Sequence, residues 1–103
     1  MVREILEQKN EIESLCRKHG VERLFLFGSA TQGITLAEVR DLDFLVQFRA
    51  MPPIEYAHSY FGFAEGLETL FQRPVDLVEL KAIDNPYFLA TVESSKVPLY
   101  ELS

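Results

Sequence analysis

The chain has 103 residues, of which 48% are apolar and 25% are charged, and its formal net charge is −6. This length predicts a single domain over residues 1–103, and an aromatic content of 12% argues against a disordered chain. The negative charge argues against direct binding of nucleic acid, and the charged N-terminus excludes a signal peptide or membrane span. Cys16 has no second cysteine to pair with, so we expect a cytoplasmic protein without an internal disulfide.

The first half of the chain predicts one helix and two strands. Apolar residues recur at three- and four-residue spacing over residues 2–19, which indicates one amphipathic helix that ends at Gly20. The continuous apolar run Val21–Phe27 is typical of a central strand covered on both faces. The segment Ala30–Arg40 lacks a clear period, and a second strand is predicted at Asp41–Phe48.

The second half of the chain predicts a helix with Ile54 and Phe61 on its apolar face. Gly62 and Gly66 interrupt that face. The predicted elements are a helix over 54–71, a strand over 75–80, a helix that Asn85 caps and that reaches about Ser94, and an edge strand or docked extension over 97–102. This order predicts an α/β or α+β fold with a small sheet.

Two aspartates begin the second predicted strand. Asp41 and Asp43 point to the same face of that strand, because side chains alternate, and Leu42 points to the other face. Two crowded carboxylates favour a hard divalent cation such as Mg²⁺. Asp76 joins them if the third strand lies beside the second, although an isolated Asp-x-Asp pattern is more often a solvated strand end.

A Gly-Ser turn follows the first predicted strand. Gly28 lets the backbone approach a ligand, Ser29 offers a hydroxyl, and Gly33 permits a tight exit from the turn. Free backbone N–H groups at the start of a short helix bind phosphate well. The chain contains no Gly-Lys-Ser/Thr sequence, so a P-loop is excluded.

Aromatic residues concentrate in the predicted helix over 54–71. Such a group is more often part of a core than a platform for a nucleotide base, but any exposed share suits a protein partner. The group comprises Tyr56, Tyr60, Phe61, Phe63 and Phe71.

Three segments together resemble the small nucleotidyltransferases of the DNA polymerase β superfamily. They are Leu26–Gly33, Arg40–Val46 and Pro74–Val78, and the resemblance extends over nearly the whole chain. The chain is most similar to the minimal nucleotidyltransferases that are encoded as antitoxins beside HEPN proteins.

The resemblance implies a nucleotidyltransferase fold, with a small mixed sheet flanked by helices, that binds ATP with two Mg²⁺ ions. It implies transfer of AMP to a hydroxyl, in the antitoxin members a tyrosine of the HEPN partner, whose RNase activity is thereby blocked. Asp76 would assist the acceptor hydroxyl as metal ligand or base. The resemblance assigns Asp41, Asp43 and Asp76 to metal binding and catalysis, and Gly28, Ser29 and Gly33 to nucleotide binding.

Three positions depart from the family pattern. Ala30 and Gln32 stand where relatives often carry arginine, and Arg40 stands where they often carry serine. These departures leave open a second hypothesis, that a degenerate nucleotidyltransferase neutralises its partner by binding alone. Transfer to a small molecule is disfavoured, because such enzymes usually add a second domain for the acceptor. The nucleotide preference and homo-oligomerisation stay open.

Overall fold

The computed structural model describes residues 2–31 and 40–102. Its elements are α1 (Val2–Leu6), α2 (Lys9–His19), β1 (Val21–Phe27), the 3-10 helix η1 (Gly28–Thr31), β2 (Leu42–Phe48), α3 (Pro53–Phe71), β3 (Val75–Glu79), the 3-10 turn η3 (Leu80–Ala82), α4 (Pro86–Ser95) and β4 (Val97–Glu101).

The four strands form one mixed sheet in the order β3-β2-β1-β4. β1 pairs antiparallel with β2 and with β4, whereas β2 and β3 run parallel. The apolar run Val21–Phe27 therefore occupies a central position, as predicted, and the C-terminal segment is an edge strand. The predicted mixed sheet with flanking helices is confirmed.

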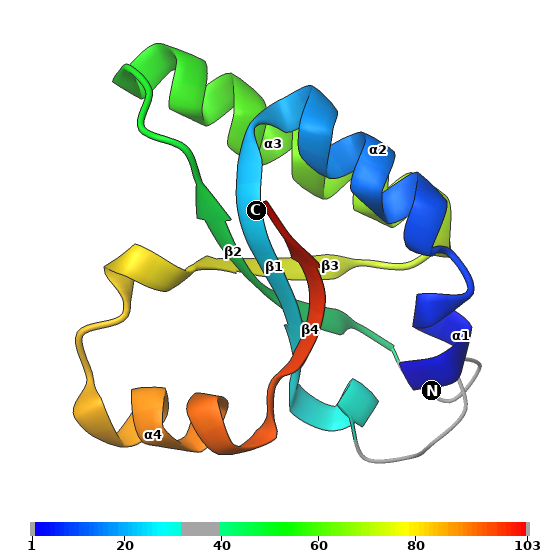
Figure 1. The fold of residues 1–103 in the computed structure, drawn as a ribbon, viewed down its shortest axis with the longest axis vertical. Helices are drawn as coiled ribbons and strands as arrows, with labels where there is room; N and C mark the ends of the chain where they lie inside the picture. The colour runs from blue at the N-terminus through cyan, green and yellow to red at the C-terminus, as the bar shows by residue number, and fades with distance from the viewer. Residues whose placement is uncertain (1, 32–39, 103) are drawn as a thin grey trace.

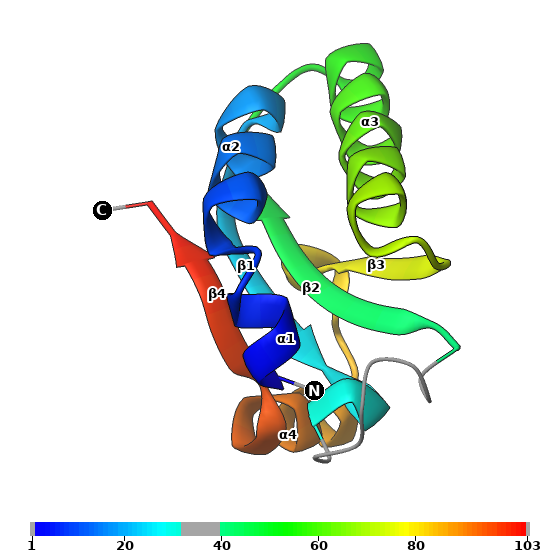
Figure 2. The same ribbon diagram turned by 90° about the vertical axis from the view of Figure 1, so that its right-hand side faces the viewer.

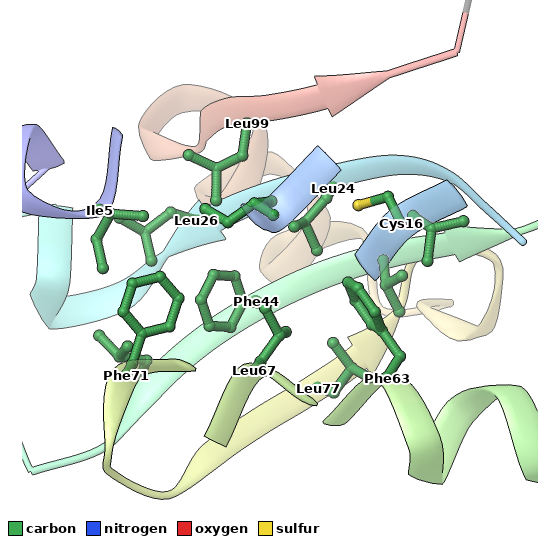
Figure 3. Close-up of a cluster of buried hydrophobic side chains, with 14 of the residues drawn as sticks. Ile5, Cys16, Leu24, Leu26, Phe44, Phe63, Leu67, Phe71, Leu77 and Leu99 are labelled. Atoms are coloured by element: carbon green, nitrogen blue, oxygen red, sulfur yellow. The ribbon is translucent and has the colours of Figure 1, made fainter. Parts of the chain in front are cut away.

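The main core lies between the sheet and α1, α2 and α3. Leu24 and Leu26 of β1 and Phe44 of β2 are buried there, and side chains from both helices and strands converge on them (Figure 3). Because side chains alternate along a strand, Phe25 points to the opposite face and joins a smaller cluster with Val92 of α4. Helices α2 and α3 lie side by side at one end of the molecule and α4 lies at the other (Figures 1 and 2).

Two of the predicted helix boundaries are confirmed by their caps. Gly20 adopts a left-handed conformation with φ of 71° and donates its N–H to the carbonyl of Cys16, which ends α2. The side chain of Asn85 accepts hydrogen bonds from the N–H groups of Tyr87 and Phe88 at 2.9 and 3.2 Å, which begins α4.

The predicted single helix over residues 2–19 is wrong, because the chain forms two helices that meet at Glu7 and Gln8. Five successive polar residues, Glu7–Glu11, separate the two buried isoleucines Ile5 and Ile12. No apolar side chain in this stretch holds the helix against the core, so the chain can bend there.

The predicted buried face of α3 is also partly wrong. Ile54 and Phe61 are 77% and 69% exposed, whereas Phe63 is fully buried. The helix carries apolar residues on all sides, so periodicity alone did not select the buried face. Nor do Gly62 and Gly66 interrupt it, because α3 continues through both.

Candidate active site

The strand register places two of the three predicted carboxylates, Asp43 and Asp76, in one row across the sheet, and Asp41 directly precedes β2. Phe27 pairs with Asp43, and Asp43 pairs with Asp76 on the neighbouring parallel strand. Leu42 and Phe44 belong to the core beside α2 and α3, so Asp43 points to the opposite face. The row therefore runs from the end of β1, where Gly28 follows Phe27, across β2 to the edge strand β3.

Gly28 has no side chain at the point where β1 approaches Asp43. Its φ of 77° is in the left-handed region, which glycine adopts without steric strain. An ideal Cβ at this position would overlap Oδ2 of Asp43 and lie 3.2 Å from its Cγ. The turn then continues as η1, where the Thr31 hydroxyl donates a hydrogen bond of 2.8 Å to the Gly28 carbonyl. The glycine is thus required by this close approach.

Asp43 experiences the charge of both other aspartates. Its partial burial raises the pKa of its carboxyl above the usual value, and the negative charges of Asp76 and Asp41 raise that pKa further. Asp41 and Asp76 are themselves exposed. The structure therefore brings Asp41 and Asp76 within electrostatic reach of Asp43.

The donor chemistry of this row suits a hard divalent cation. Carboxylate oxygens are preferred ligands of Mg²⁺, and a cation would offset the repulsion that raises the pKa of Asp43. Within residues 2–31 and 40–102, however, no three His, Cys, Asp or Glu side chains are gathered in a group that could hold a metal ion. The three aspartates offer the carboxylate oxygens that Mg²⁺ prefers, and Asp43 and Asp76 lie in one row. Their ligation of a metal ion stays a prediction.

Some predicted positions fall outside what the structure describes. Gly33 and Gln32 lie outside the described residues, and the structure describes only the backbone of Ser29, within η1. Arg40 is described and exposed. Among the ion pairs of the described residues, none joins Arg40 to Asp41.

Tyr60 is a neighbour of this row that the sequence did not single out. Its hydroxyl donates a hydrogen bond to the backbone carbonyl of Leu77. Burial raises the pKa of Tyr60, and the negative charge of Asp76 raises it further. Because Tyr60 falls on the apolar face of its helix, its spacing marked it only as a candidate for the core.

Comparisons with known proteins show the family to which the chain belongs. The family model for the nucleotidyltransferase domain matches residues 8–99. A curated protein of Methanocaldococcus jannaschii, named "Putative protein adenylyltransferase MJ1379", is 31% identical over 96 residues, which cover 93% of this chain and 92% of the relative. The chain therefore belongs to the nucleotidyltransferase domain family and is a minimal nucleotidyltransferase of the DNA polymerase β superfamily.

Solved structures share the fold. A structure described as a "putative minimal nucleotidyltransferase" is 27% identical, with a TM-score of 0.74 and coverage of 94% of both chains. A toxin-antitoxin structure with AMP-PNP is 24% identical, with a TM-score of 0.65 and coverage of 92% of this chain and 74% of that one. An MNT antitoxin in complex with tri-AMPylated Shewanella oneidensis HEPN toxin is 21% identical, with a TM-score of 0.61 and coverage of 92% and 71%.

No helix within residues 2–31 and 40–102 combines the length and the apolar character that a membrane span needs.

Proposed function

We propose that the chain transfers AMP from ATP to a hydroxyl group of a HEPN-type partner protein, and that it acts as the antitoxin to that partner. The observation that carries the proposal is the row formed by Gly28, Asp43 and Asp76, each on a different strand or strand end. The names of the adenylyltransferase relative and of the AMPylated toxin complex support protein as the acceptor class.

The two ends of the row would bind different reactants. The backbone at Gly28 and Ser29 would hold the triphosphate, because a short helix that begins at a glycine offers free N–H groups, and Gly33 is a further candidate from the sequence alone. The acceptor hydroxyl would arrive at Asp76, on the edge strand. A bond would form between the acceptor oxygen and the α-phosphorus while the bond to the β-phosphate breaks, which releases pyrophosphate. The proton of the acceptor hydroxyl would pass to Asp76 acting as base.

Two Mg²⁺ ions would be held by Asp41, Asp43 and Asp76. When bound, such ions neutralise phosphate charge and lower the pKa of the attacking hydroxyl. The fold itself positions the residues of the row. Because Leu42 and Phe44 pack in the core, the side chain of Asp43 points to the opposite face of the sheet, beside Gly28.

The test is transfer of label from α-³²P-ATP to the product of the adjacent gene, with Mg²⁺ present. We expect the partner to be labelled, and we expect Asp43→Asn to lower the rate by about 100-fold or more, because it removes a charge at the reacting centre. Asp84→Asn is the matched control, since Asp84 is exposed in the loop before α4 and should keep full activity.

Two results would contradict the proposal. One is undiminished transfer by Asp43→Asn. The other is a wild-type chain that binds its partner and neutralises it without labelling it. The second result would instead support neutralisation by binding alone, the hypothesis motivated by Ala30 and Gln32.

A further inference from the structure

A hollow of about 530 Å³ lies along the free edge of β3, between that strand and α3. We call it the edge hollow. Its apolar part comes from Tyr60, Phe61 and Leu77, and its charged part from Glu65, Glu68 and Asp76. Asp76 is therefore part of both the edge hollow and the row of carboxylates.

The backbone at this edge is already engaged by α3. Oε2 of Glu68 accepts a hydrogen bond of 3.1 Å from the N–H of Val75, and the Tyr60 hydroxyl donates to the carbonyl of Leu77. These two bonds occupy backbone groups that an added strand would need. A strand added at this edge would have to displace both bonds, so the edge favours a ligand that binds through its side chains.

Phe61 presents a large apolar surface at this place. Its side chain is 69% exposed, and its ring packs edge-on against Tyr60 with the ring centroids 5.3 Å apart. Exposed aromatic rings with one face supported are frequent anchors in protein interfaces. Phe61 is thus available to an apolar side chain of a partner.

The charge of the edge hollow is of one sign. Glu65, Glu68 and Asp76 line it, and none of its lining residues is basic. An occupant that brings a cationic group complements this charge.

The edge hollow lies at the β3 end of the row. The turn at Gly28 lies at one end, and β3 is the outer strand at the other end. An acceptor that reaches Asp76 from outside the sheet passes along this edge.

We propose that the edge hollow binds the acceptor protein beside its modified hydroxyl, through an arginine or lysine at Glu65 and an apolar side chain on Phe61. This inference rests on the proposed transfer to a protein. It adds the chemistry by which the acceptor is selected.

The experiment uses two short fluorescein-labelled tyrosine peptides that differ only in their flanking residues, arginine in one and glutamate in the other. Fluorescence anisotropy measures their binding to the full chain. We expect the arginine peptide to bind more tightly, and Glu65→Lys to weaken it by about three- to tenfold, the range expected for an exposed ion pair that is reversed. Phe61→Ala should weaken the same peptide about threefold, because an apolar contact is lost.

The matched control is Glu101→Lys. It makes the same change of charge on β4, the strand at the opposite edge of the sheet. The chain's charge of −6 attracts any basic peptide, and both variants weaken that general attraction equally. Equal effects of Glu65→Lys and Glu101→Lys, or no preference for the arginine peptide, would overturn the proposal.

Binding of Mg²⁺-ATP, measured by calorimetry, separates this inference from the proposed function. Glu65→Lys and Phe61→Ala should bind the nucleotide as the wild type does. If the wild type transfers AMP to the partner but does not prefer the arginine peptide, only the proposed role of the edge hollow is refuted. If the wild type neither binds the nucleotide nor transfers AMP to the partner, the proposed function is refuted.

Discussion

Gly28 leaves free the space that the carboxylate of Asp43 occupies, since a Cβ at position 28 would overlap Oδ2 of Asp43. This relationship joins the end of β1 to the second residue of β2. It gives the glycine a steric role in addition to its left-handed φ.

The first prediction concerns this approach. Gly28→Ala should lower the free energy of unfolding by about 1–3 kcal/mol, because it adds both backbone strain and overlap with Asp43. Urea denaturation measures the effect. In an Asp43→Ala background the same substitution should cost less, since only the strain remains. An alanine variant as stable as the wild type would contradict the steric role.

The second prediction concerns charge in the row. The folded pKa of Asp43 is raised, so the folded state binds its proton more readily than the unfolded state and loses stability as the pH rises above the usual value of 3.8. Asp43→Asn should therefore stabilise the protein at pH 7 by about 0.3–1 kcal/mol, a magnitude reduced by solvent screening. The gain should disappear below that pH.

Thermal denaturation between pH 3 and pH 8 checks the second prediction, with Asp84→Asn as the control. Adding Mg²⁺ should raise the melting temperature of the wild type more than that of Asp43→Asn, because the ion relieves the repulsion between the carboxylates. A gain of equal size at all pH values would contradict the electrostatic origin.

The third prediction concerns the contact between α2 and α3. A Cβ on Gly66 would lie 2.7 Å from Cδ2 of Leu15, and a Cβ on Gly62 would lie 2.8 Å from Cε1 of His19. In an unobstructed helix, Gly→Ala gains about 1 kcal/mol. Here Gly66→Ala should instead lower the free energy of unfolding by about 1 kcal/mol, because the side chain of Leu15 or the helix that carries it must shift.

A double-mutant cycle with Leu15→Ala tests the third prediction. The combined variant should be less destabilised than the sum of the two single variants, because the truncated side chain makes room for the new methyl group. If Gly66→Ala alone raises the free energy of unfolding, the predicted steric conflict with Leu15 of α2 is contradicted.

The fourth prediction concerns Cys16, which is fully buried in the main core. Burial raises the pKa of its thiol to about 12, with a further increase from the charge of Glu13. The thiol should react with a disulfide reagent at pH 8 at least about 100-fold more slowly in the folded than in the unfolded protein. Rapid labelling of the folded chain, followed by absorbance, would contradict this burial.

The sequence was sufficient to predict elements whose signals are local. The continuous apolar run of β1, the glycine that ends α2 and the Asn85-Pro86 start of α4 each depend on nearby residues, and the structure confirms all three. Alternation along one strand also predicts a common face for Asp41 and Asp43, but the observed strand β2 begins only at Leu42, so this stays a prediction.

The tertiary structure decided relationships between distant residues. Only the parallel register of β2 and β3 places Asp76 opposite Asp43, because strand pairing is set by packing and not by spacing in the sequence. The exposure of Phe61 has the same origin: α3 is apolar on all sides, so contact with α2 and the sheet selects which ring is buried. Local sequence thus determined the chemical groups, and long-range packing determined which of them meet.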